Sequence, residues 1–110
     1  DLREARTSGN SFVGADLRRA ILDRLNLREA NLSGANFEYG DMIEIDLRDA
    51  NLRNANLAGV NLYGANLNGA DLTGANLEGA NLERALMTDT KLDGVTYGQT
   101  IMPDGTRKGD

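Results

Sequence analysis

The 110-residue sequence has no cysteine, no histidine and no tryptophan, and it has one proline. Without cysteine there are no disulfides and no thiol chemistry, so cysteine usage says nothing about the compartment. Without histidine the chain cannot build a Ser-His-Asp triad, a histidine-ligated metal site or a histidine general base. Aromatic residues make up only 5%, too few for a surface that stacks the bases of single-stranded nucleic acid.

The charge balance and the apolar runs exclude two further classes. The chain carries 12 Lys and Arg against 17 Asp and Glu, a formal net charge of −5. It has no basic stripe, so direct nucleic-acid binding is not expected. Its apolar runs are only a few residues long, which predicts a soluble chain without a membrane span. The length fits one domain.

An internal repeat with a period of five residues dominates the sequence. Of the 16 leucines, 14 share one position of the repeat, and 12 of the 13 alanines lie two places earlier. Nine of the 12 asparagines lie between these two positions. We call these the central, Ala and Asn positions, and the two residues after the centre the first and second corner positions. Eighteen units run without insertion, with centres from Phe12 to Tyr97.

This period fits neither a helix nor an ordinary strand. In an α-helix, a five-residue spacing rotates by 140° per unit and leaves no constant apolar face. In a strand, it would send the central residue to alternate faces. A chain that turns a corner in every unit keeps the central and Ala positions inside, and the closed polygon then stacks as a parallel solenoid.

The pattern A-[DN]-L-x-x over residues 10–99 resembles the pentapeptide repeat family. The resemblance implies an all-β fold, a right-handed quadrilateral parallel β-helix in which four pentapeptides form one coil. Eighteen units would then give about 4.5 coils, and residues 20 apart would stack. We expect every central residue to be buried, including Leu52, Leu57, Leu62 and Leu67.

The Asn position has two interpretations. Repeated carboxamides and carboxylates could bind ions, but asparagine side chains also satisfy backbone groups at corners, and we favour this structural role. Likewise we interpret Met42 and Met87 as core residues rather than as ligands. The sequence therefore predicts no metal site, no cofactor and no catalytic residues.

Glycine at the second corner position predicts type II turns, because glycine readily adopts positive φ. Five consecutive units, from Gly59 to Gly79, have it. We expect residues 57–81 to be the most regular part. The corners should be more mixed where larger residues stand, at Arg19, Arg24, Glu29, Tyr39, Glu44 and Asp49.

Departures from the repeat suggest where function lies. Leu25 and Ile45 replace alanine 20 residues apart, so we expect their coils to be locally wider. Ile43 is expected to lie outside, stacked on Tyr63. With Asp41 and Glu44 beside them as an acidic rim, these residues form a possible interaction face for a basic partner.

The two ends are expected to act as caps, because an open solenoid exposes sheet edges and core. Residues 1–9 are interpreted as a short N-terminal helical cap, 10–99 as the β-helix and 100–110 as a C-terminal loop cap and tail. Ile101 or Met102 should cover the core, and residues 106–110 should be frayed. The IMPDGT ending is similar to cyanobacterial members of the family.

The leading functional hypothesis is a non-catalytic scaffold or protein-interaction module with an unknown protein partner, because no nucleophile-base pair is available. The chain is expected to be a monomer or weak dimer, in the cytoplasm, periplasm or thylakoid lumen. The alternative is a DNA mimic that inhibits DNA gyrase or another topoisomerase, as some family members do. Those members are longer and dimerise through a C-terminal helix, which this sequence does not predict.

Overall fold

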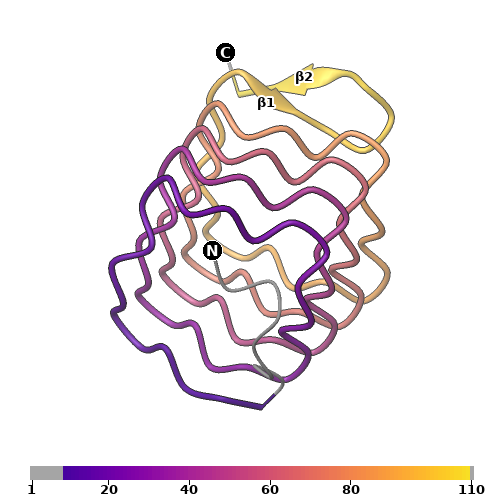
Figure 1. Ribbon diagram of the computed structural model, residues 1–110. Coiled ribbons are helices and arrows are strands. Elements are labelled where there is room, and N and C mark those ends of the chain that lie inside the picture. Colours follow the sequence, from indigo (N-terminus) through magenta and orange to yellow (C-terminus); the bar gives the residue numbers. More distant parts are fainter. Residues whose placement is uncertain (1–8, 110) are drawn as a thin grey trace.

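A computed structural model describes residues 9–109, and the chain winds into a stack of four-sided coils (Figure 1). Parallel bridges join residues 20 apart, from Ser11–Asn31 to Asn81–Ile101. Because the unit has five residues, this register places four units in each coil. The predicted parallel stacking is confirmed, whereas the right-handed turn and the count of about 4.5 coils stay predictions.

Backbone hydrogen bonds between coils hold the stack together. The Leu32 N–H donates to the Asn51 carbonyl at 2.7 Å, and the Asn31 N–H donates to the Asn10 carbonyl at 2.9 Å. At the corner, the Gly34 N–H donates to the Arg53 carbonyl at 2.9 Å. The units from Asn31 to Arg84 repeat this pattern, so their backbone polar groups that face neighbouring coils are satisfied.

The core is a set of stacked central residues with small residues between them. The central residues from Leu22 to Leu82 are buried, and Leu52, Leu57, Leu62 and Leu67 are fully enclosed as predicted. The expectation that every centre is buried is wrong at the ends. The outer centres are only partly buried, because a described coil covers them on one side alone: Phe12, Leu17, Met87, Leu92 and Tyr97.

The corners are more uniform than the sequence predicts. From Phe12 to Leu82, the N–H at each Ala position donates to the carbonyl of the preceding centre, at 2.8–3.3 Å. The second corner position has positive φ in every unit, 66–74° at glycine and 54–61° at other residues. Positive φ at the second central residue is a feature of the predicted type II turn. Arg19 and Tyr39 share it with the glycine corners, because the same coil-to-coil hydrogen bonds hold them, but their φ of 59° is smaller, and the turn type there stays a prediction.

Residue size at the Ala position alters the turn slightly. The hydrogen bond that closes the turn measures 2.8 Å at Gly40 and 2.9–3.1 Å at the alanines. It lengthens to 3.2 Å at Leu25 and Val60 and to 3.3 Å at Ile45, all of which are buried. A larger side chain pointing inward therefore opens the turn. An outward shift of the Leu25 and Ile45 Cα atoms, compared with Ala65, stays a prediction.

The C-terminal end closes with a small hairpin (Figure 1). Strand β1 (Thr100–Ile101) continues the coil ladder, and β2 (Arg107–Lys108) pairs with it antiparallel. Met102 packs against the core, as one of the two predicted alternatives. The expectation of frayed residues from 106 onward is wrong for β2, which covers the free edge of β1.

Two further expectations concern the N-terminal cap and a membrane span. The predicted N-terminal helical cap is not supported: residues 1–8 lie outside the described residues, and Gly9 is in a turn. Among residues 9–109, no helix is long and apolar enough to cross a membrane.

Candidate interaction surface

The candidate surface is one side of the coil stack, which we call the Ile43–Tyr63 face. Its units are centred on Leu22, Met42, Leu62 and Leu82. The Asp41–Asn61 bridge places Ile43 and Tyr63 in adjacent coils. The Glu44 N–H donates to the Tyr63 carbonyl at 2.8 Å, so the backbone fixes their spacing. The structure thus brings together all four residues that the sequence singled out.

The predicted apolar pair is less exposed than two of its neighbours. Ile43 and Tyr63 are half-buried, whereas Ile21 is 45% exposed and Tyr39 is 57% exposed. Ile21 lies on the same face in the preceding coil, and Tyr39 stands at the corner that borders Asp41. The prediction omitted both residues. The sequence did contain a sign of each: Ile21 is an apolar residue at the Asn position, and Tyr39 is a large residue at the second corner position.

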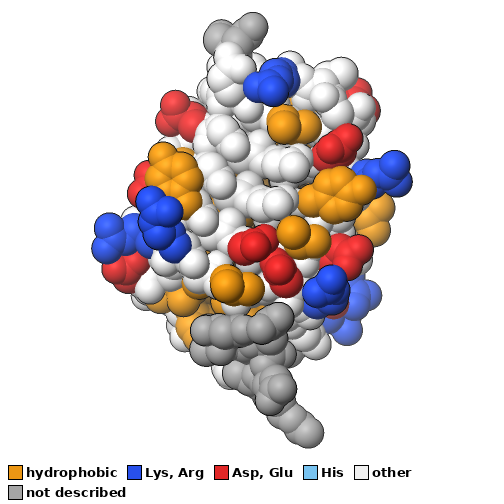
Figure 2. Space-filling model, turned by 45° about the horizontal axis from the view of Figure 1, so that its top comes forward, with side chains coloured by type: hydrophobic (Ala, Val, Ile, Leu, Met, Phe, Trp, Pro, Cys, Tyr) orange, Lys and Arg blue, Asp and Glu red, His pale blue; other side chains and the backbone are white. Residues whose placement is uncertain are grey.

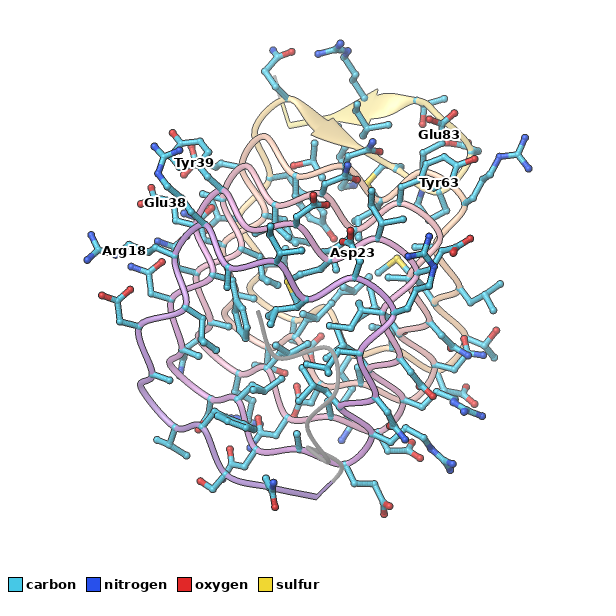
Figure 3. The ribbon with its side chains drawn as sticks, in the orientation of Figure 1. Arg18, Asp23, Glu38, Tyr39, Tyr63 and Glu83 are labelled. Atoms are coloured by element: carbon cyan, nitrogen blue, oxygen red, sulfur yellow. The ribbon has the colours of Figure 1, made fainter. Side chains whose placement is uncertain are left out.

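Figure 3 shows how wide this surface is. Tyr63 and Glu83 lie close together on one side of the stack, and Tyr39, Glu38 and Arg18 lie on the opposite side of the view. Figure 2 shows hydrophobic side chains as separate groups, each bordered by charged side chains. The apolar groups therefore form an interrupted patch, with polar surface between them.

Tyr39 is held in place by residues of the adjacent coils. The Arg19 guanidinium lies 5.2 Å from the centre of the Tyr39 ring, a cation–π contact. On the other side the ring lies across Gly59, where a Cβ atom would be 2.5 Å from Tyr39 Cδ1. Glycine at position 59 therefore makes room for the ring.

The acidic rim carries less free charge than the sequence suggests. Glu44 Oε1 lies 3.3 Å from Arg24 Nε in an exposed ion pair. Burial raises the pKa of Asp41, and a hydrogen bond with Asp23 raises it further. The Arg24 guanidinium therefore balances the charge of Glu44, and the raised pKa of Asp41 favours its protonated form more than in an ordinary aspartate.

Side chains at the Asn position serve the backbone, as the structural interpretation predicts. The Asn61 side-chain oxygen accepts the Tyr63 N–H at 3.1 Å, and Asn66 accepts the Asn68 N–H at 3.1 Å. Asp71 does the same for the Thr73 N–H at 3.0 Å. Within residues 9–109, no group of three or more acidic side chains is arranged to hold a metal ion.

On the other sides of the coil stack, arginine side chains form ion pairs with acidic residues. Hydrogen bonding from Arg18 lowers the pKa of Asp16 to about 2, although both side chains are exposed. A hydrogen bond from Arg48 likewise lowers the pKa of Asp46. Arg48 Nη2 lies 2.7 Å from Asp46 Oδ2 in this pair.

Comparison with known proteins identifies relatives for this geometry. The family described as Pentapeptide repeats matches in eight copies, over residues 11–49, 50–89 and 65–96. No curated protein matches the chain.

Solved structures of related proteins share the fold. Rfr23, a pentapeptide repeat protein from the cyanobacterium Cyanothece 51142, is 38% identical with a TM-score of 0.64. The match covers 80% of this chain and 64% of Rfr23. A pentapeptide repeat protein from the Arabidopsis thaliana thylakoid lumen is 32% identical with a TM-score of 0.69, covering 93% of this chain and 68% of that protein.

A more distant structure is similar in fold alone. QnrB1, a plasmid-mediated fluoroquinolone resistance protein, is 18% identical with a TM-score of 0.51. The match covers 88% of this chain and 64% of QnrB1. The chain therefore spans just under two thirds of both Rfr23 and QnrB1.

Proposed function

The chain belongs to the pentapeptide repeat family, and from this premise we propose that it is a non-catalytic module that binds a protein partner through the Ile43–Tyr63 face. One observation carries the proposal. Four large apolar side chains lie along this face and at its corner, as separate groups: Ile21, Tyr39, Ile43 and Tyr63. A rigid backbone ladder holds them, so a partner orders few groups on binding.

The chemistry of the face favours a basic partner. Asp41 and Glu44 lie beside Ile43, and Asp23 reaches it from the preceding coil through a hydrogen bond to its N–H. An apolar centre with an acidic rim is complementary to an apolar surface bordered by lysine or arginine. Binding should weaken as salt screens the rim.

A pair of double variants tests this assignment. The full chain is used as bait in an extract of the organism that encodes it, and the recovered partner is titrated against each variant. The test variant is Ile43→Ser with Tyr63→Ser. The control, Val13→Ser with Leu86→Ser, removes apolar groups that are 58% and 53% exposed on other sides. We expect weakened binding for the test variant and unchanged binding for the control; the reverse result contradicts the proposal.

A DNA mimic that inhibits gyrase or another topoisomerase is the competing function. Such a mimic needs long stretches of unneutralised negative charge. Here arginines interrupt the acidic residues in close pairs: Asp16–Arg18, Asp46–Arg48 and Asp71–Arg53, at 2.8, 2.7 and 3.2 Å. We expect purified DNA gyrase to supercoil plasmid equally well with and without the protein. Inhibition in that assay favours the mimic.

The finer assignments accompany this proposal. We infer a monomer or weak dimer that needs no cofactor, with residues 10–99 as the binding body and residues 100–110 as its cap. The likeness to a thylakoid-lumen protein supports a lumenal or periplasmic location, with the cytoplasm as the alternative. Sedimentation of the purified chain and fractionation of the source cells test these two points.

A further inference from the structure

The backbone of Ile43 has an unusual hydrogen-bond acceptor. In the regular units, the side chain at the Asn position accepts the N–H two residues later, as Asn36 does for Glu38 at 3.0 Å. At Ile43, the N–H donates instead to Asp23 Oδ1 of the preceding coil, at 2.9 Å. Asp41, which occupies the Asn position there, has therefore lost its usual donor.

The consequence is a buried acceptor without a partner. Asp41 Oδ1 is enclosed and makes no hydrogen bond. A similar cross-coil bond occurs at Thr88, whose N–H donates to Asn68 at 2.8 Å. There, however, the Asn position holds Leu86, which has no acceptor to displace. Of these two units, the one at Ile43 therefore has both a cross-coil acceptor, Asp23, and a second carboxyl group, Asp41.

The two carboxyl groups are also close to each other. Both approach the same N–H group, because Asp23 Oδ1 accepts the Ile43 N–H that the side chain at the Asn position accepts in the regular units. The interaction with Asp23 adds to burial in raising the pKa of Asp41. Two carboxylates this close in a partly buried site cannot both ionise easily, because the like charges repel and burial disfavours the charged form. A proton between them resolves both problems, since a protonated Asp41 donates to Asp23 while Asp23 still accepts the Ile43 N–H.

We propose that Asp23 and Asp41 share one proton, forming a joint between adjacent coils that changes the charge of the Ile43–Tyr63 face with pH. The inference rests on the proposed function, because it concerns regulation of that same face. In acid the joint is intact and the face has one negative charge fewer. As pH rises the proton leaves, the two carboxylates repel, and the face becomes more attractive to a basic partner.

Among residues 9–109, the charged groups around the Asp41 carboxylate already have other partners. In the adjacent positions, Arg24 pairs with Glu44 at 3.3 Å. At the preceding corner, Arg19 stacks on Tyr39 at 5.2 Å. The following coil contributes Tyr63, which is uncharged at neutral pH. The proton is therefore the group that relieves the repulsion between the two carboxylates.

Linkage fixes the sign of the effect on stability. Because the pKa of Asp41 is raised in the folded protein, its proton is bound more tightly there than in the unfolded chain. The resulting stabilisation is fully present below the ordinary value of 3.8 and is lost as pH rises through the raised pKa of Asp41. Acid therefore strengthens this joint.

The experiment follows the aspartate carboxyl carbons of the full-length protein by carbon-13 NMR between about pH 2.5 and 7.5. We expect the Asp41 midpoint to lie above the ordinary aspartate value of 3.8. Asp93 is an exposed aspartate at a first corner position like Asp23 and provides the control variant. In Asp23→Asn, the asparagine still accepts the Ile43 N–H, as Asn68 does for Thr88, and the midpoint of Asp41 should fall. The control Asp93→Asn should leave the Asp41 midpoint unchanged.

A stability measurement gives an independent readout. In Asp41→Asn the amide donates to Asp23 at every pH, so the melting temperature of the wild type should fall relative to this variant as pH rises through the acid range. An Asp41 midpoint at or below 3.8 in the wild type overturns the shared proton, as does a midpoint that does not move in Asp23→Asn. Neither result bears on the Ile43→Ser and Tyr63→Ser binding test, so the two proposals fail separately.

Discussion

Replacing Gly59 or Gly79 by alanine separates two contributions to the free energy of unfolding: the strain of positive φ and the contact with the Tyr39 ring. Both glycines have positive φ, 68° and 69° respectively. At Gly79 an added Cβ would meet only the Gly59 backbone, at 3.7 Å, an ordinary contact. At Gly59 it would lie 2.5 Å from the Tyr39 ring, so the ring must move.

The expected magnitudes follow from these contacts. The left-handed conformation costs an L-residue roughly 1–2 kcal/mol, and the stiffer unfolded chain returns about 0.4–1 kcal/mol. Gly79→Ala should therefore lower the free energy of unfolding by about 1 kcal/mol. Gly59→Ala should also lose the Arg19–Tyr39 contact, which is worth about 0.5–1 kcal/mol at an exposed site.

Urea unfolding monitored by circular dichroism measures both variants, and a double-mutant cycle isolates the ring. In the Tyr39→Ser background, Gly59→Ala should lower the free energy of unfolding by only as much as Gly79→Ala does, because the ring is no longer there. Equal costs at the two glycines in the wild-type background would refute the reasoning, because the ring would then not occupy the space above Gly59.

Three further tests address the core, the cap and an ion pair. Leu62→Ala should cost about 2–5 kcal/mol in urea unfolding, since the side chain is fully enclosed, whereas the exposed Glu78→Ala should cost under about 0.5 kcal/mol. Thr100→Val should cost about 1–3 kcal/mol, because the buried hydroxyl donates to a core carbonyl at 2.7 Å; a neutral result would contradict this bond. Asp46→Asn should be less stable than the wild type near neutral pH, and this difference in stability should shrink in acid. The reason is that the Arg48 hydrogen bond lowers the pKa of Asp46, so the stability contributed by the Asp46 carboxylate is lost as pH falls through that pKa. A difference in melting temperature that stays constant with pH would contradict this.

The repeat alone determined the register and the core. A period of five with one large apolar residue per unit specifies which residue points inward, and uninterrupted copies specify which residues stack. Leu57 and Leu62 are enclosed as predicted, and Asn61 serves the backbone as predicted. These features were predictable because each depends on a rule that is local to one unit and repeats along the chain.

The corners and the candidate surface were decided by contacts between coils. Arg19 and Tyr39 adopt positive φ, at 59° each, although the local preference of about 1 kcal/mol favours glycine there. Hydrogen bonds to the next coil on the same backbone outweigh that preference. Similarly, the Ile43 N–H donates to Asp23 instead of Asp41, which is nearer in the sequence. This choice of acceptor depends on the orientation of a side chain 20 residues away in the sequence. The five-residue repeat pattern contains no information about that orientation.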